Sequence, residues 1–131
     1  MISLFVLAGV AASVLPRGVL AARSTPTIPA LKLRGNVERG KHVFLVVASC
    51  QSCHTLKNAR ANGTLGPNLD KLKPSFKLVA TTVSLGRPAN PKTGENMPAF
   101  SHVKGAQYAP FVLTSQQIAD VAKYVSTVAG R

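Results

Sequence analysis

Apolar residues recur at helical spacing in three segments of the chain, and this pattern predicts three amphipathic helices. The most regular segment follows Thr114, where the apolar positions fall on one face of a helix that ends at Gly130. Thr114 and Gln117 have the spacing of a capping box, which marks the start of this helix. Its apolar stripe consists of Ile118, Val121, Ala122, Val125 and Ala129.

Two weaker patterns precede this helix. Asn36 is placed to cap a first helix that runs into a cysteine-containing segment, and a second helix is predicted from Pro74 to Leu85. No strand-like alternation of useful length and no repeat is found, so the pattern predicts an all-α domain of three or more short helices with long loops. The apolar positions are Val37, Gly40, Phe44 and Val47 in the first helix and Phe76, Val79, Ala80 and Val83 in the second.

The first 22 residues form an apolar stretch broken by Pro16 and Arg17. Small residues at its end suit a signal peptidase, although no Lys or Arg precedes the apolar run as it does in most export signals. A retained anchor is the alternative, because the stretch approaches the ~20 residues that span a bilayer. We expect cleavage near Ala22 and an exported protein, in the periplasm or at the outer face of the cytoplasmic membrane.

Residues 23–35 combine Pro, Thr and charged residues without a helical period, which predicts a flexible N-terminal tether. The domain proper is then expected from residue 36 to residue 131. A domain of this size has a small core. The chain contains no Trp, and aromatic residues make up only 5% of it. A bound apolar group would therefore be the largest apolar group in the core.

Cys50 and Cys53 are the only cysteines of the chain, and His54 follows directly. At C-x-x-C-H spacing two thiols can bind the two vinyl groups of one porphyrin, while the histidine supplies the proximal iron ligand. A thioredoxin-type pair would need a βαβ pattern, and a zinc site would have to recruit His42 or His102. A local disulfide would leave His54 unexplained. The run therefore predicts one haem c, covalently attached through Cys50 and Cys53.

The order of these features resembles that of the class I cytochromes c, the family of small monohaem bacterial cytochromes, over about residues 36 to 131. Gly40 and Phe44 match the glycine and aromatic residue of the family's first helix, and Val121 with Tyr124 matches its last helix. The resemblance implies the class I cytochrome c fold, with short helices and long loops wrapped around one haem. It also implies a close crossing of these two helices at Gly40.

Two further motifs carry the resemblance into the haem site. Gly66-Pro67-Asn68-Leu69 matches the segment whose proline carbonyl accepts a hydrogen bond from the haem histidine, which implies that Pro67 orients His54. Asn96-Met97-Pro98-Ala99-Phe100 resembles the family's distal-ligand motif, and Met97 is the only methionine besides the initiator. The implied iron ligands are therefore His54 and Met97.

His102 is the alternative distal ligand, although ligation by His102 would leave the Met-Pro motif without a role. The chain also departs from the family pattern in two long loops, residues 81–95 and 101–113, which match no motif. We expect them to be surface variation. A role in solvent access to the haem or in partner docking is the alternative.

Lys and Arg number 16 against four acids, so the formal charge is +12, and two ionised haem propionates would leave the protein strongly basic. This charge predicts acidic redox partners, such as an oxidase, a cytochrome bc complex or a dehydrogenase. Scattered lysines and few aromatic residues argue against nucleic acid. An anionic lipid surface is the alternative, with membrane association through the N-terminus if the leader is retained. We expect a monomer.

By the resemblance, the chain is a one-electron carrier that shuttles electrons between membrane or extracytoplasmic partners, as in a respiratory chain. Two protein ligands would saturate the iron and leave no open position for a substrate, so we expect no enzymatic activity. One alternative is a haem subunit of a dehydrogenase complex. The other is a ligand-binding haem sensor or peroxidase, which requires that Met97 be displaceable.

Overall fold

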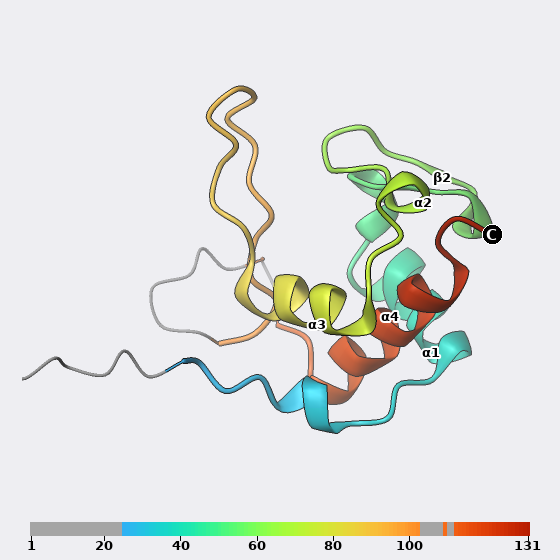
Figure 1. The fold of residues 1–131 in the computed structure, drawn as a ribbon, viewed down its shortest axis with the longest axis vertical. Helices are drawn as coiled ribbons and strands as arrows, with labels where there is room; N and C mark the ends of the chain where they lie inside the picture. The colour runs from blue at the N-terminus through green and yellow to red at the C-terminus, as the bar shows by residue number, and fades with distance from the viewer. Residues whose placement is uncertain (1–24, 103–108, 110–111) are drawn as a thin grey trace, which may run out of the picture.

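The computed structural model describes residues 25–102, 109 and 112–131, and the predicted leader lies outside these residues. Its helices are α1 (Val37–His42), α2 (Leu69–Leu72), α3 (Phe76–Leu85) and α4 (Ser115–Val128) (Figure 1). Side chains cap the start of each helix, because the first backbone N–H groups lack partners within it. These caps are Asn36, Asn68, Ser75 and Thr114, the last in the capping box with Gln117 that the sequence predicts.

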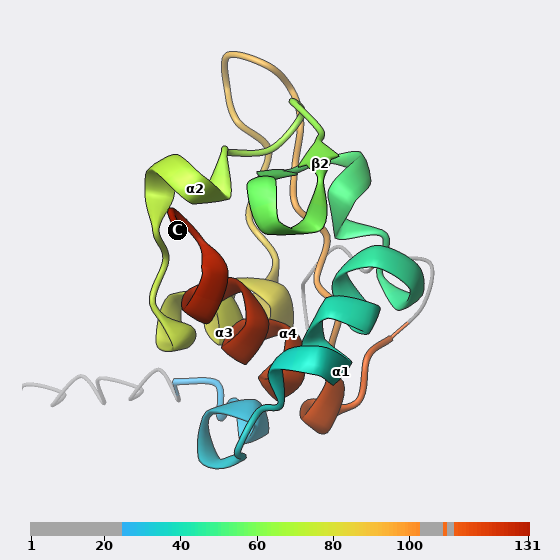
Figure 2. The ribbon, with the colours of Figure 1, turned by 90° about the vertical axis from the view of Figure 1, so that its right-hand side faces the viewer.

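The longest helix, α4, packs against both α1 and α3 and forms the centre of the core (Figures 1 and 2). At its crossing with α1, a Cβ on Gly40 would collide with the Asp120 carbonyl group, so the two backbones touch there. Phe44 and Tyr124 stack edge to face one turn further on, with ring centroids 5.9 Å apart. The Tyr124 hydroxyl donates to the Asn58 amide oxygen at 2.9 Å, which ties α4 to the segment after His54.

The predicted first helix reaches the cysteines, but not as a regular α-helix. Beyond His42 it widens into a π-helical turn, Val43–Val47, which the Ala48 N–H closes by donating to the Val43 carbonyl at 2.8 Å. Ser49 then takes a left-handed conformation with φ 49°, and the 3₁₀ turn Cys50–Ser52 follows. The helix therefore ends abruptly, and the chain turns directly into the cysteine segment.

Short strand pairs, which the sequence did not predict, accompany the helices. β1 (Thr55–Leu56) pairs antiparallel with β2 (Ala61–Asn62), in the register Leu56 to Ala61. A second antiparallel contact joins Arg87 to Met97 and closes a hairpin that extends away from the helices (Figure 1). The fold is thus that of helices and long loops, as expected, with two minimal antiparallel pairs that shape the loops.

Residues 28–35, expected as part of a tether, pack against the domain. A 3₁₀ turn, Pro29–Lys32, contacts α3 and α4 and buries Ala30, which is 1% exposed. Gln116 in α4 donates to the Arg34 carbonyl at 2.9 Å, and the Gly35 backbone lies directly against that of Ala119. The domain boundary at residue 36 stays a prediction, and these contacts add that the preceding residues belong to the packed structure.

Among the described residues, no helix is both long enough and apolar enough to cross a membrane.

Candidate haem site

The cysteine segment is a single tight turn. The Cys53 and His54 N–H groups both donate to the Cys50 carbonyl, at 3.2 and 2.9 Å, so the turn carries both thiols and the imidazole. Both thiols are free and half-buried. Burial raises the pKa of the Cys50 thiol to about 12, whereas the nucleophilic cysteine of a thioredoxin-type pair has a lowered pKa. The setting of Cys50 therefore disfavours the thioredoxin interpretation.

The His54 ring is held by the backbone of the Gly-Pro segment. Its Nδ1 donates to the Pro67 carbonyl oxygen at 2.9 Å, and because a carbonyl can only accept, the proton of the neutral ring resides on Nδ1. This leaves Nε2 with a free lone pair. Pro67, which the sequence marked for this bond by resemblance, thus lies in hydrogen-bond contact with His54.

Gly66 brings this segment close to the imidazole. A Cβ at this position would lie 2.5 Å from Cε1 and 2.7 Å from Nδ1 of His54, so only glycine fits against the ring. The Gly66 N–H also donates to the Cys53 carbonyl at 2.7 Å. In the sequence, Gly66 stands out only as part of the Gly-Pro motif. Its position next to Pro67 was the available signal for this role.

Gly63 is a second glycine in close backbone contact, and no sequence motif marks it. A Cβ there would lie 2.6 Å from the Cys53 carbonyl carbon and 2.7 Å from the Gln51 carbonyl oxygen. Its own carbonyl accepts a hydrogen bond from the Thr55 hydroxyl at 2.8 Å. The strand pair after His54 therefore folds back closely onto the cysteine turn. No local pattern marks this contact, because it depends on the residues opposite.

Met97 is half-buried and packs against the core at the end of the hairpin. Its carbonyl accepts from the Arg87 N–H at 2.7 Å, and its own N–H donates to the Arg87 carbonyl at 3.3 Å. Ala99 and Phe100, which follow, are buried. The Met-Pro segment thus has a fixed backbone register against Arg87, just beyond the end of α3.

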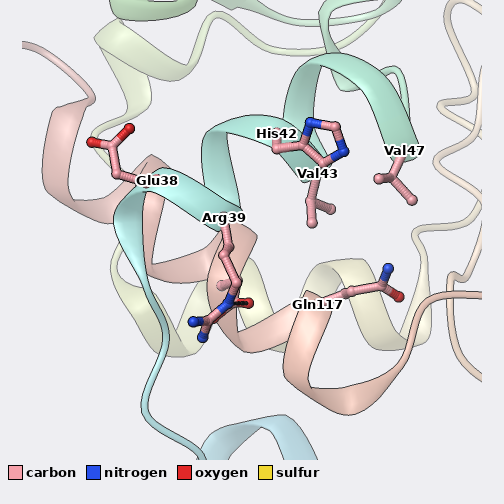
Figure 3. Close-up of a pocket in the computed structure, with 7 residues that line it drawn as sticks. Glu38, Arg39, His42, Val43, Val47 and Gln117 are labelled. Atoms are coloured by element: carbon pink, nitrogen blue, oxygen red, sulfur yellow. Dashed lines mark hydrogen bonds and ion pairs between the residues drawn. The ribbon is translucent and has the colours of Figure 1, made fainter.

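The other two histidines are exposed. His42 is exposed on α1, at the rim of a groove of about 470 Å³ whose far side carries Gln117 of α4 (Figure 3). His102 is exposed beside a second cavity of about 330 Å³, which Ile28, Pro29 and Ser84 also line. In the described part of the chain, no three His, Cys, Asp or Glu side chains gather as a metal cluster. This arrangement does not favour the zinc interpretation.

The groups that the cysteine turn and the Met97 segment present fit a c-type haem. They comprise two free thiols on one turn, an imidazole whose Nδ1 is hydrogen-bonded to a backbone carbonyl, and the half-buried thioether of Met97. These are the attachment and ligand types of His/Met haem proteins. The residues that could hold the group are therefore Cys50, Cys53, His54 and Met97, with Pro67 behind the imidazole.

The sequence model of the cytochrome c family matches residues 37–129, which is well over half of the chain. The chain belongs to the cytochrome c family. This membership confirms the resemblance to class I c-type cytochromes, and Cys50 and Cys53 stand at the spacing with which the family binds haem c.

Two solved structures are similar to this cytochrome. The c-type cytochrome SorU from Sinorhizobium meliloti is 39% identical over 72% of this chain and 92% of its own, with a TM-score of 0.54. SoxXA from P. pantotrophus is 27% identical over 74% of this chain and 84% of that chain, with a TM-score of 0.52. No curated protein sequence matches the chain.

Proposed function

We propose that this cytochrome is a one-electron carrier whose haem c is attached through Cys50 and Cys53 and whose iron is held by His54 and Met97. When bound, haem supplies the one-electron couple of its iron. The observation that carries the proposal is the 2.9 Å bond from His54 Nδ1 to the Pro67 carbonyl, on the same turn as the two thiols. This bond supports a metal-ligand role for His54, because it leaves Nε2 free to coordinate.

Each residue has a defined task in this proposal. The Pro67 carbonyl holds the proton at His54 Nδ1 and fixes the ring plane, while Gly66 lets the backbone approach the ring. Met97 provides a soft thioether, which favours a relatively high potential. Two protein ligands leave no coordination position for a substrate, so the chain acts as a carrier and not as an enzyme.

The partners and the location follow from charge and from the leader. A net charge of +12 favours acidic redox partners, such as an oxidase, a cytochrome bc complex or a dehydrogenase. The apolar leader supports export, so that transfer takes place in the periplasm or at the outer face of the cytoplasmic membrane. In this proposal the protein is a monomer that carries electrons between membrane or extracytoplasmic partners.

Covalent attachment is tested by denaturing electrophoresis followed by haem staining. We expect the stain to stay with the wild-type polypeptide and to vanish when Cys50 and Cys53 are both replaced by Ala. Ser52→Ala is the matched control, because Ser52 lies in the same turn and should leave the stain unchanged. Haem that leaves the wild-type chain on denaturation would refute the proposed cofactor.

A further inference from the structure

The hairpin that leads to Met97 begins at an unusual backbone position. Gly86 ends α3, with its N–H donating to the Thr82 carbonyl at 2.8 Å, and adopts φ 70° and ψ −174°. This region of backbone conformation is essentially restricted to glycine. Any other residue at position 86 would force the chain to leave α3 in another direction.

Gly86 also touches the Met97 segment directly. A Cβ on Gly86 would lie 2.6 Å from the Met97 carbonyl oxygen, 2.8 Å from the Ala99 nitrogen and 3.0 Å from the Pro98 carbonyl carbon. All three atoms belong to the backbone, so no side-chain rotation could relieve the collision. A side chain at this position would displace the strand that carries Met97.

The same strand is held on both sides of this contact, first by Arg87, which follows Gly86, and then by the end of α3. Before it, Arg87 and Met97 exchange two backbone hydrogen bonds. After it, the Phe100 N–H donates to the Val83 carbonyl at 2.9 Å, and the Ser101 hydroxyl donates to the Ser84 carbonyl at 2.7 Å. The last carbonyls of a helix lack partners within it, so the strand satisfies groups that would otherwise be unpaired.

From this geometry we infer that Gly86 is a positioning residue for the distal ligand and sets the register in which Met97 is presented. The inference rests on the proposed His54 and Met97 ligation. A ligand side chain must be held to within about 0.5 Å of its productive place, and the side-chain collisions at Gly86 would demand a larger shift. The outer part of the hairpin, residues 88–95, is exposed, so the contacts that position Met97 lie at the base of the hairpin.

The test compares Gly86→Ala with Gly94→Ala in the haem-loaded protein. Gly94 also has a positive φ, 74°, but a Cβ there would have no atom within 4 Å. We expect Gly86→Ala to lose most of the weak red absorption of Met-ligated ferric haem, and its reduced form to gain a carbon monoxide complex that the wild type does not form. Gly94→Ala should keep the wild-type spectrum. An intact red band and no gain in carbon monoxide binding in Gly86→Ala would overturn the inference.

If Gly86→Ala does not fold, a second pair of variants tests the role of the hairpin base. Arg87→Pro removes the N–H that donates to the Met97 carbonyl and leaves Gly86 in place, whereas Ala89→Pro alters the exposed hairpin away from this bond. We expect a weakened red band in Arg87→Pro and a wild-type band in Ala89→Pro. Equal bands in the two variants would contradict a role for the hairpin base.

The wild type and Met97→Ala separate this inference from the proposed function. A wild-type protein without the red band, or with a band that survives in Met97→Ala, would refute Met97 as the ligand and the inference with it. A wild-type band that Met97→Ala abolishes but Gly86→Ala preserves would refute only the role of Gly86.

Discussion

Asp120 is a carboxylate buried between α1 and α4, with a side chain that is 3% exposed. Burial alone would raise its pKa, but hydrogen bonds from Arg39, Gln116 and the Asn36 N–H, together with the positive charge of Arg39, lower the pKa below its usual value. The donor distances lie between 2.7 and 3.0 Å. Ionised Asp120 therefore fastens the start of α1 and the segment before it to α4.

This pairing predicts a pH-dependent stability. Because the folded pKa of Asp120 lies below the unfolded value of about 3.9, its contribution is present above that pH and is lost as the pH falls through the folded pKa. Asp120→Asn should lower the free energy of unfolding at pH 7 by about 1–3 kcal/mol, since buried donors lose a charged acceptor.

Urea unfolding of the haem-loaded protein at decreasing pH measures this effect. The deficit of Asp120→Asn should shrink as the pH drops below about 4. Glu95→Gln serves as the control, because Glu95 is an exposed acid in the hairpin and should cause little change at any pH. A deficit that is the same at all pH values would mean that Asp120 acts through shape and not through charge.

At the level of single residues, most of the candidate site could be predicted from the sequence. Cys50, Cys53 and His54 form a local motif, and Pro67 came from a second local motif that the structure places 2.9 Å from His54. The close backbone contacts of Gly63 and Gly86 could not be predicted, because they depend on the backbone that lies opposite each glycine. Spacing along the chain contains no information about such contacts.

Among the helices, the crossing of α1 and α4 depends most on a single residue. Gly40 lies where a Cβ would meet the Asp120 carbonyl and the Tyr124 Cβ. In a helix free of such contacts, Gly→Ala would stabilise by about 1 kcal/mol. A collision with backbone in a packed interface costs about 1–3 kcal/mol and outweighs this gain. The sign of the stability change caused by Gly40→Ala therefore shows whether the backbones of α1 and α4 touch.

Gly40→Ala should thus lower the thermal unfolding temperature of the haem-loaded protein instead of raising it. For a domain of this size, a net loss of 1 kcal/mol corresponds to a decrease of about 4–8 °C. Lys41→Ala, on the neighbouring position of the same helix, is the control and should change the temperature little. A more stable Gly40→Ala variant would contradict the close crossing.

The elements differ in how far the sequence determined them. α3 and α4 have strong caps and regular apolar spacing, and both were predicted to within a few residues. The first helix was predicted as continuous, yet it ends in a π-helical turn and a left-handed Ser49. The two strand pairs and the packing of residues 28–35 were missed, because each depends on partners distant in sequence and not on a local period.

At the scale of the whole molecule, two of the four acids make internal contacts, whereas Glu38 and Glu95 are exposed, as are many of the described basic residues. Asp120 pairs with Arg39, and Asp70 accepts from the Lys57 and Gly130 N–H groups at 2.7 and 2.9 Å. Many lysines are exposed, including Lys57 beside the cysteine turn. The surface therefore presents net positive charge to a partner.

If acidic partners dock near the haem, electron transfer should slow as salt is added, because such attraction is screened over ~8 Å at physiological ionic strength. Charge reversal at Lys57, Lys71 or Lys92 should reduce the second-order rate more than reversal at Lys123 on α4. The same is expected of Lys104, which lies outside the described residues.

Stopped-flow mixing with an acidic redox protein measures these rates, while the spectrum and potential of each variant should stay nearly constant. Equal losses at all the lysines, or rates that do not respond to salt, would mean that the positive charge only keeps the surface solvated.

The central claim is a covalent haem c whose iron carries His54 and Met97 and has no open position. The visible spectrum of the purified protein, oxidised and then reduced with and without carbon monoxide at neutral pH, tests it most directly. We predict the red Met–ferric absorption in the oxidised form and a reduced spectrum that carbon monoxide leaves unchanged. A missing red band together with a carbon monoxide complex would contradict the claim and support a ligand-binding haem protein.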